Sequence, residues 1–497
     1  MRGLFGLAAT AATLITQSLA VPIVVAPGDV TDLIITEHNT INGTHVPQFK
    51  AQAANQALAA GTPLTVSLTN NFGGSGGQLY AYVNGKDMTG AVVMLSNSGE
   101  WYYPDPAGST IPVAVEADIA IPLNGRGEKT EITIPDYIES GRIWVAEGEL
   151  TFFTVMDGNG LPQLVEPSAA NPEDPSAGIN WGFVELTNTA DAGIWANISF
   201  VDFIGLILSM SLTLGSGETQ TVEGLRGDAL PLICDELAAQ TAIDGQPWDQ
   251  MCVRDGSGNP LRVMAPNMYV ASNPGAQDGY YDEYVEQVWA KYSAEDLIIN
   301  TQAAPGEVAC RVDAGSDELR CDGDNRGYPR PTVVDIWGCN SGPFAISGED
   351  NAVHVAVVPR LCAAFHRTTL LAEGGNVQPG PASDTYYAED PTSHYARLVH
   401  KYEVDGRGYA FSYDDVNPAG ENAAGVVSGP DPQVLEVFIG GTLSNATSHK
   451  RAPRHKKLTK LAVAIIKSIR PWINDVKADE KLYESGFSPF YKSLDTT

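Results

Sequence analysis

Short apolar runs separated by turn-forming residues dominate the chain up to about residue 160. From about residue 28, runs rich in valine, isoleucine, threonine and aromatic residues alternate with clusters of glycine, asparagine, aspartate and proline. Runs of this length and composition favour strands, and the clusters between them favour turns. The pattern predicts an antiparallel sandwich or barrel, whose expected strands carry TPLTVSL, QLYAYV, AVVMLS, PVAVEADIAIPL and KTEITI.

A helical pattern replaces the β pattern after residue 205. Apolar residues recur at helical spacing in two stretches, the first after a candidate N-cap at Asp228. We expect the aromatic stripe of the second stretch to lie in the core, because such stripes are more often core than sugar-binding platforms. The helices predict a mixed α/β insert to about residue 330. The stretches contain Leu230, Ile233, Cys234, Leu237 and Ala238, and then Tyr281, Tyr284, Val285, Val288, Trp289 and Tyr292.

The β pattern resumes after the insert and ends near residue 443. Its expected strands carry TVVDIWGC, VHVAVV, YAFSY and LEVFIGG, interrupted by one helix around Val358, Leu361, Cys362 and Phe365. The expected fold class is therefore mainly β with an α/β insert. We divide the chain into a signal peptide (1–20), the first part of a β domain (21–205), a mixed α/β domain (206–330), the second part of the β domain (331–445) and a tail (446–497).

The first twenty residues predict a secretory signal peptide. Arg2 supplies the positive start, residues 3–16 are mostly apolar, and Ser18-Leu19-Ala20 offers a cleavage site with small residues. A membrane anchor is the weaker interpretation, because the apolar run is short and interrupted by threonine. We expect a secreted protein, extracellular or at the cell wall.

The tail is basic and then amphipathic, with apolar residues on one side before Pro471. One interpretation is a flexible or processed appendage. The alternative is a cationic helix that binds a membrane surface or cell wall weakly.

Charge and cysteine content narrow the class of protein. The chain has 30 basic and 60 acidic residues, a formal net charge of −30, which repels phosphate backbones and excludes nucleic acid as an expected partner. The six cysteines suit an oxidising compartment and predict three disulfides. Pairing of nearest neighbours is the simplest expectation, and other connectivities remain open.

Several catalytic motifs are absent or out of context. The stretch Gly73–Gly77 has the spacing of a nucleophile elbow, but strand-like sequence flanks it on both sides, so a β turn is the better interpretation. The stretch that begins at Asp322 departs from a calcium loop at Arg326 and Val333. No HExxH pair and no zinc-spaced cysteine pair occurs. We expect no metal and no organic cofactor.

Two carboxylates lie inside otherwise apolar runs, Glu185 in FVEL and Asp202 in FVDF. An isolated buried charge is costly, so each acid needs a partner or a catalytic role. Strand alternation places Trp181, Phe183 and Glu185 on one face. Two acids among aromatic, hydroxyl and amide side chains are typical of a site that cleaves sugars.

The register of the hairpin that joins the two acids is open at this point. A turn centred near residues 193–194 places Glu185 and Asp202 opposite each other or on a diagonal. A turn centred on Asp191 offsets them by about five residues, too far for joint catalysis along a straight strand. The residue pattern alone leaves two interpretations, a catalytic pair and two structural acids.

Five segments together resemble the glycoside hydrolase family 64 β-1,3-glucanases of the thaumatin-like superfamily: NWGFVELT, GIWANISFVDFIGL, YYDEYVEQVWAKYS, VDIWGCNSGPF and GYAFSYDDV. The resemblance implies a thaumatin-like β-sandwich or barrel domain and a mixed α/β domain that flank a wide groove for a long glucan. It implies cleavage with inversion, without metal or cofactor, by Glu185 as general acid and Asp202 as general base. Inversion favours the diagonal register, because water needs room between the acids. The sugar-contacting positions that it implies are Thr187, Asn188, Trp195, Asn197 and Ser199.

The leading hypothesis is a secreted, monomeric hydrolase of β-1,3-glucan, such as laminarin, curdlan or wall glucan. The alternative is a thaumatin-like protein that binds β-glucan without cutting it. Asn197-Ile198-Ser199 is a glycosylation sequon within the expected site, and we expect it to be unmodified because a buried or strand-bound asparagine is a poor acceptor.

Overall fold

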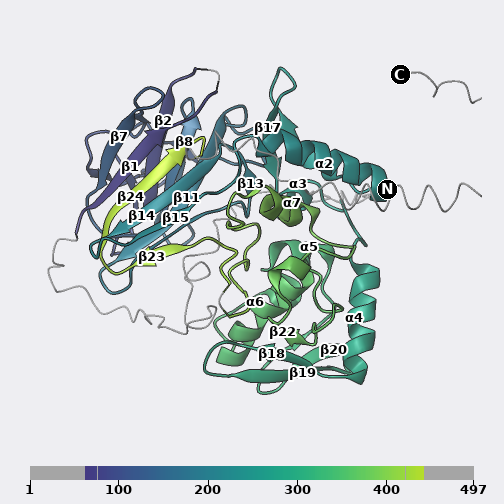
Figure 1. Ribbon diagram of the computed structural model, residues 1–497. Helices are drawn as coiled ribbons and strands as arrows, with labels where there is room; N and C mark the ends of the chain where they lie inside the picture. The colour runs from purple at the N-terminus through teal and green to yellow at the C-terminus, as the bar shows by residue number, and fades with distance from the viewer. Residues whose placement is uncertain (1–61, 75, 420, 442–497) are drawn as a thin grey trace, which may run out of the picture. The chain divides into compact units, whose positions relative to one another are not determined.

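The computed structural model describes residues 62–74, 76–419 and 421–441 (Figure 1). The expected signal peptide and tail lie outside the described residues. Within the described part, no helix combines the length and the hydrophobicity needed to cross a membrane.

The β part contains two large sheets (Figure 1). One has the order β15-β14-β24-β1-β7, in which β1 pairs with β24 in parallel and the other pairs are antiparallel. The strands near both ends of the described chain are therefore neighbours. The bounds are β1 Leu64–Asn70, β7 Lys129–Ile134, β14 Leu208–Leu214, β15 Thr219–Val222 and β24 Pro432–Ile439.

The second large sheet has the order β23-β12-β11-β8-β2-β3-β4, with β6 added on β2. A separate small sheet has the order β10-β9-β5. The bounds are β2 Leu79–Lys86, β3 Val92–Leu95, β4 Trp101–Tyr102, β5 Val113–Ala114, β6 Ile121–Pro122, β8 Ile138–Glu147, β9 Phe153–Met156, β10 Pro162–Val165, β11 Asn180–Thr189, β12 Gly193–Ile198 and β23 Val427–Gly429.

Strand β11 is buried on both of its faces. Val184 and Leu186 point into the main core, which also contains Met210 of the first large sheet. The alternate residues Trp181 and Phe183 belong to a second, aromatic cluster on the other face. Glu185 lies on this second face, so the aromatic cluster shields its carboxylate from water.

The remaining segments form helices and two further sheets, β13-β17-β16 and β21-β20-β19-β18-β22. Helix α4 contacts β19, and α6 contacts β18 and β22. The helices are α2 Ala229–Asp244, α3 Pro266–Ser272, α4 Asp282–Ala294, α5 Val333–Gly338, α6 Ala352–His366 and α7 His394–Tyr402. The 3-10 helices are η1 Trp248–Met251, η2 Gly342–Phe344 and η3 Ser383–Thr385. The strands are β13 Phe203–Ile204, β16 Cys252–Arg254, β17 Pro260–Met264, β18 Leu297–Asn300, β19 Glu307–Asp313, β20 Glu318–Cys321, β21 Gly327–Tyr328 and β22 Val377–Gln378.

The helices α2 and α4 confirm the two helical stretches. The side chains of α4 that formed the aromatic stripe are buried, so the stripe is core, as expected. The helix expected around Val358 is α6, which begins six residues earlier at Ala352, where Asn351 caps it by accepting from the N–H of His354.

The expected domain boundaries differ from the observed elements in two places. Strands β14 and β15 follow residue 206 but belong to the first large sheet, so the β part does not stop at residue 205. The segment 331–445 contains α5, α6 and α7, and two of its expected strands, TVVDIWGC and VHVAVV, are largely helical. The stretch YAFSY forms turns, and Ser199 makes an isolated bridge with its Tyr409. Helix α5 begins with a capping box between Thr332 and Asp335, a local signal that outweighs its β-branched residues.

All six cysteines form disulfides between nearest neighbours in sequence, the simplest of the expected pairings. The pairs are Cys234–Cys252, Cys310–Cys321 and Cys339–Cys362.

Candidate active site

A row of polar side chains crosses four neighbouring strands of the second large sheet. Strand register aligns Asn84 on β2 with Arg142 on β8, Arg142 with Glu185 on β11, and Glu185 with Asn197 on β12. Paired residues of antiparallel strands point to the same face. The row therefore lies on the face of Glu185, next to the aromatic cluster.

Arg142 links two carboxylates within this row. Its Nε and Nη2 atoms lie 3.4 and 3.3 Å from Oε1 of Glu185, and its Nη1 donates to Oε2 of Glu166. The guanidinium also lies over the Phe183 ring, 4.6 Å from the ring centroid. Arginine is suited to such a position, because its planar fork can bind carboxylates and stack on an aromatic ring.

The hairpin of β11 and β12 is centred on Asp191, because Thr189 pairs with Gly193 and Glu185 pairs with Asn197. The diagonal register that the resemblance favoured is therefore wrong. Along a straight strand, this register would carry Asp202 five residues past the partner of Glu185 (202 − 197). The strand is not straight, because β12 ends at Ile198.

Residues 199–205 leave the sheet after β12, form the short strand β13 of another sheet at residues 203–204, and bring the chain back to the edge of β11 at Leu206. Since Val184 pairs with Ile198, a continued strand would place residue 201 opposite Trp181 (184 + 198 − 181). Instead, Leu206 donates its N–H to the Trp181 carbonyl at 2.9 Å, so five extra residues (206 − 201) are accommodated. The excursion contains Asp202, and its charge acts on Glu185 by raising the pKa of that acid. The folded chain thus brings the two acids within electrostatic reach of each other.

Glycines allow this close return of the chain. A Cβ on Gly182 would lie 2.4 Å from the carbonyl oxygen of Leu206, and one on Gly205 would lie 2.1 Å from that of Trp181. Both distances are too short for any side chain, so the two glycines of GFVE and FIG permit the excursion.

Segments distant in sequence hold the excursion in place. The N–H of Phe200 donates to the carbonyl of Tyr409 at 2.7 Å, and the N–H of Ala265 donates to the carbonyl of Asp202 at 2.9 Å. The phenol of Tyr395 on α7 donates to the carbonyl of Phe200 at 2.6 Å. Asp202 is therefore positioned by its backbone, while its side chain remains available.

Both acids are buried, with 4% of Glu185 and 8% of Asp202 exposed. The pKa of Glu185 is raised to about 7. Burial is the main cause, the charge of Asp202 also raises the pKa, and the nearby Arg142 opposes both effects. Burial likewise raises the pKa of Asp202 to about 6, against the opposing effect of Arg142. Burial thus favours the protonated form of both acids, and Asp202 is as desolvated as Glu185.

Each acid has a buried oxygen without a hydrogen-bond partner, Oε2 of Glu185 and Oδ1 of Asp202. Oδ1 of Asn197, directly across from Glu185, is also unpartnered. Buried polar atoms are normally paired, so three unpaired oxygens in one region indicate a place where another molecule supplies the missing contacts.

Of the other predicted contact residues, three lie near the acids and one does not. Thr187 and Trp195 pair across β11 and β12, two positions from Glu185 and Asn197, and are partly exposed on the same face. Ser199 begins the excursion, and its hydroxyl accepts from the N–H of Val201 at 3.4 Å. Asn188 pairs with Ile194 on the opposite, core-facing side of the hairpin, so it does not join the group.

Sequence reasoning missed four residues around the acids: Arg142, Glu166, Tyr395 and Tyr409. Arg142 stands at the start of the run RIWVA, directly after Glu139, Ser140 and Gly141, so it lacks the signal that singled out Glu185, a charge with apolar residues on both sides. The other three lie outside regular strands or on a distant helix, and nothing local distinguishes them.

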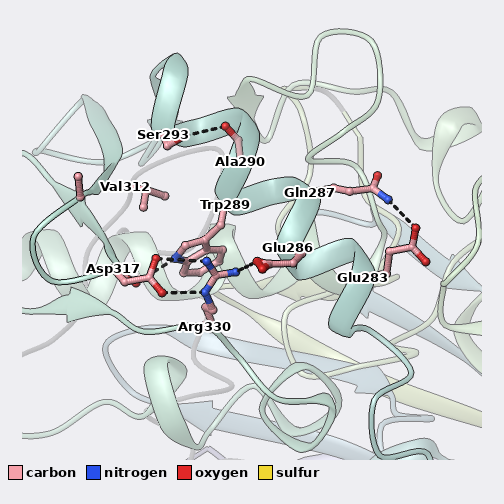
Figure 2. Close-up of a pocket in the computed structure, with 10 residues that line it drawn as sticks. Glu283, Glu286, Gln287, Trp289, Ala290, Ser293, Val312, Asp317 and Arg330 are labelled. Atoms are coloured by element: carbon pink, nitrogen blue, oxygen red, sulfur yellow. Dashed lines mark hydrogen bonds and ion pairs between the residues drawn. The ribbon is translucent and has the colours of Figure 1, made fainter.

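A separate cavity of about 530 Å³ is lined by α4 and by residues of the hairpin that joins β19 and β20 (Figure 2). Arg330 stacks over Trp289 and binds both Asp317 and Glu286, while Gln287 donates to Glu283. The charged groups Arg330, Asp317 and Glu286 thus bind one another, whereas Glu185 and Asp202 each have a buried oxygen without a partner. Among the described residues, no group of three or more His, Cys, Asp or Glu side chains could hold a metal ion.

Comparisons with known proteins place the chain that forms this site in a family. The sequence profile of the family described as β-1,3-glucanase, glycoside hydrolase family 64, matches residues 62–439. Two curated relatives named glucan endo-1,3-β-glucosidase, from Cellulosimicrobium cellulans and Arthrobacter sp. (strain YCWD3), are each 28% identical over 365 residues, or 72% of this chain. The chain spans 63% of the length of these relatives.

Solved structures of β-1,3-glucanases also match the fold of this chain. A laminaripentaose-producing β-1,3-glucanase in complex with laminaritetraose matches with a TM-score of 0.66 and 27% identity, over 76% of this chain and 98% of that one. A β-1,3-glucanase domain from Clostridium beijerinckii shares the fold, with a TM-score of 0.59 and 20% identity over 76% of this chain and 98% of that one. Since the matched family region covers most of the chain and includes both buried acids, the chain belongs to the β-1,3-glucanases of glycoside hydrolase family 64.

Proposed function

We propose that this protein hydrolyses β-1,3-glucan with inversion, using Glu185 as general acid and Asp202 as general base. One observation carries the proposal: two buried carboxylates from different segments interact electrostatically, and each keeps one oxygen without a partner. Structural acids in a core are normally fully paired. Two desolvated acids with different proton affinities suit acid–base catalysis instead.

The order of the two pKa values fits these roles. Glu185, with the higher pKa of about 7, keeps its proton at a pH at which Asp202, with a pKa of about 6, is more ionised. Glu185 gives its proton to the glycosidic oxygen as the bond from that oxygen to the anomeric carbon breaks. Asp202 takes a proton from water as the water oxygen bonds to that carbon from the opposite face. A β-linkage then yields an α-anomer.

The side chains around the acids suit a neutral sugar. Thr187, Trp195, Asn197 and Ser199 offer hydroxyl, amide and indole groups, which are the groups that bind sugar hydroxyls and ring faces. The matched solved glucanase contains laminaritetraose, a short β-1,3-linked glucan. We propose that the two large sheets form a thaumatin-like β domain and that a long glucan lies in a wide groove beside the face of Glu185.

The test combines product analysis with two isosteric variants. The protein should release reducing ends from laminarin, and NMR should detect the α-anomer before mutarotation. Glu185→Gln and Asp202→Asn should each lower turnover by about 10²-fold or more, because positioned acid–base groups contribute about 10²–10⁴-fold. Glu100→Gln, the same change at an exposed site, serves as the control.

An activated glycosyl fluoride should partly rescue Glu185→Gln but not Asp202→Asn, because its leaving group needs little protonation. A β-anomer as first product would contradict the role of Asp202. Binding of laminarin without release of sugar at any pH from about 3 to 8 would instead favour the alternative, a glucan-binding protein that does not cut.

We also propose that the protein is secreted as a monomer after cleavage of residues 1–20. The apolar start of the chain and the three disulfides support secretion. The mass of the protein recovered from culture medium should correspond to a chain that starts at Val21. Retention of Met1 would contradict cleavage of the signal peptide. The molar mass of a dimer in solution would contradict the monomeric state.

A further inference from the structure

A continuous buried hydrogen-bond network leads away from Glu185 behind the two acids. Glu185 accepts from Arg142, and Arg142 donates to Oε2 of Glu166. The other oxygen of Glu166 accepts from Nδ2 of Asn84 at 2.6 Å, and Oδ1 of Asn84 accepts from the indole N–H of Trp144 at 2.5 Å. Every one of these side chains is thereby held by a neighbour.

Glu166 enters this network from outside the sheet. It follows strand β10 at the start of the loop that leads to β11, whereas Asn84, Arg142 and Glu185 lie on adjacent strands of the sheet. Its side chain is only 13% exposed, against 6% for Arg142 and 5% for Glu185. Burying a third carboxylate beside two others is costly, unless an opposite charge compensates it. The guanidinium of Arg142 is that charge for Glu166.

We propose that Glu166 and Arg142 form a positioning pair for the two acids: Arg142 holds one oxygen of Glu185, and Glu166 limits how strongly the charge of Arg142 acts on Glu185 and Asp202. This inference rests on the proposed function and assigns residues that assist the acids without touching the reacting atoms. Because Arg142 binds only Oε1 of Glu185, Oε2 remains free for proton donation.

The electrostatic effects of the pair oppose each other. Besides burial, the positive charge of Arg142 lowers the pKa of both acids, and the negative charge of Glu166 raises the pKa of both. The other groups that face the acids are Asp202 itself and the phenols of Tyr409, near Glu185, and Tyr395, near Asp202. Burial raises the pKa of both phenols well above the ordinary value, so they remain neutral. The balance between Arg142 and Glu166 therefore sets the pH range in which one acid is protonated and the other ionised.

The test is the pH profile of kcat/KM on laminarin, which reports the ionisation of the free enzyme. Glu166→Gln keeps the size of the side chain and removes its charge, so both limbs of the profile should shift to lower pH. Arg142→Met removes the opposing charge, so both limbs should shift to higher pH, by about one pH unit or more. Opposite shifts from two partners of one ion pair are not expected from loss of structure alone, which lowers turnover without moving the profile.

Two exposed substitutions serve as matched controls, Glu100→Gln and Arg126→Met, which should leave the profile unchanged. The double variant Arg142→Met/Glu166→Gln should have a profile between those of the single variants. If Arg142→Met does not fold, the test uses the two single variants Glu166→Gln and Arg142→Lys. Arg142→Lys keeps the positive charge, so its pH profile should stay close to that of the wild type.

An unchanged profile in Glu166→Gln, or a shift of both single variants in the same direction, overturns the inference. Failure of the proposed function would look different. If Glu185→Gln and Asp202→Asn still hydrolyse laminarin, the acids themselves are wrongly assigned. If these two variants lose activity while Glu166→Gln keeps the wild-type profile, only the positioning pair is refuted.

Discussion

The phenol of Tyr395 donates to the backbone carbonyl of Phe200 at 2.6 Å and so ties helix α7 to the excursion that carries Asp202. Tyr395 is fully buried, and the bond joins residues 195 positions apart in sequence. The position of Asp202, the proposed general base, thus depends on a helix near the other end of the described chain.

Replacing Tyr395 by phenylalanine should therefore affect both stability and catalysis. The variant leaves the Phe200 carbonyl without this donor, which should destabilise the fold by about 1–3 kcal/mol. The excursion should also loosen, so kcat should fall more than KM rises. Thermal denaturation and steady-state kinetics measure the two effects, with the exposed Tyr103→Phe as control. An unchanged kcat in Tyr395→Phe would show that the excursion keeps its place without this bond.

Activity should depend on pH as a narrow bell. Below about pH 6, Asp202 becomes protonated and cannot accept a proton from water. Above about pH 7, Glu185 loses the proton that it must donate. The kcat/KM profile should therefore be highest between these values and fall on both sides. A profile that stays flat from about pH 5 to 9 would contradict the assignment of these two acids.

Glu185→Gln should stabilise the fold at alkaline pH. Because the pKa of Glu185 is raised by burial from 4.5 to about 7, the folded state is penalised wherever the unfolded carboxyl is ionised. The penalty is absent below about pH 4.5, grows up to about pH 7 and is complete above it. The variant should thus melt at a higher temperature than the wild type near pH 8, with a smaller difference near pH 4. Equal melting temperatures at both pH values would indicate that the acid is more hydrated than its burial implies.

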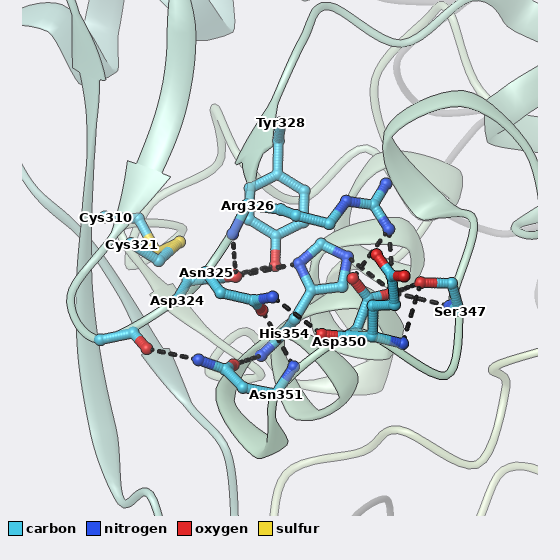
Figure 3. A network of polar contacts seen from close by, with 12 residues as sticks. Cys310, Cys321, Asp324, Asn325, Arg326, Tyr328, Ser347, Asp350, Asn351 and His354 are labelled. Atoms are coloured by element: carbon cyan, nitrogen blue, oxygen red, sulfur yellow. Dashed lines mark hydrogen bonds and ion pairs between the residues drawn. A yellow bond between two sulfur atoms is a disulfide. The ribbon is translucent and has the colours of Figure 1, made fainter.

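The opposite sign is expected for Asp324, in the buried network between the loop that joins β20 to β21 and helix α6 (Figure 3). Burial alone would raise the pKa of Asp324, but hydrogen bonds with His354 and Tyr328 outweigh it and lower the pKa below 3.8. Asp324 therefore contributes stability above about pH 4, and this contribution is lost as the pH falls through its folded pKa.

Asp324→Asn should consequently lower the unfolding free energy by about 1–3 kcal/mol near neutral pH, because the amide replaces a charged acceptor of two hydrogen bonds. The deficit should shrink as the pH falls and the wild-type carboxyl becomes protonated. Denaturant titrations of Asp324→Asn and of the exposed neighbour Asp322→Asn test this. Equal losses in the two variants would contradict a specific role for Asp324.

Part of the fold could be predicted because its signals are local. The strands β1, β2, β3 and β7 have β-branched and aromatic runs bounded by turn residues, and α2 and α4 show helical spacing. Helix α6 shows the limit of this reasoning. It is buried almost all round, so its apolar run VHVAVV lacks a polar face and reads as a strand.

The two acids were recognisable from the sequence by itself, because a charge within an apolar, strand-forming run stands out without knowledge of the fold. Arg142 carried no such signal, because Glu139, Ser140 and Gly141 directly precede it in the sequence. The pairing of the acids was decided only by the tertiary structure. The hairpin register alone would separate them, and Asp202 reaches Glu185 because residues 199–205 leave the sheet. Contacts from Ala265, Tyr395 and Tyr409 hold that excursion, and hydrogen bonds between residues so far apart in sequence leave no periodic pattern along the chain.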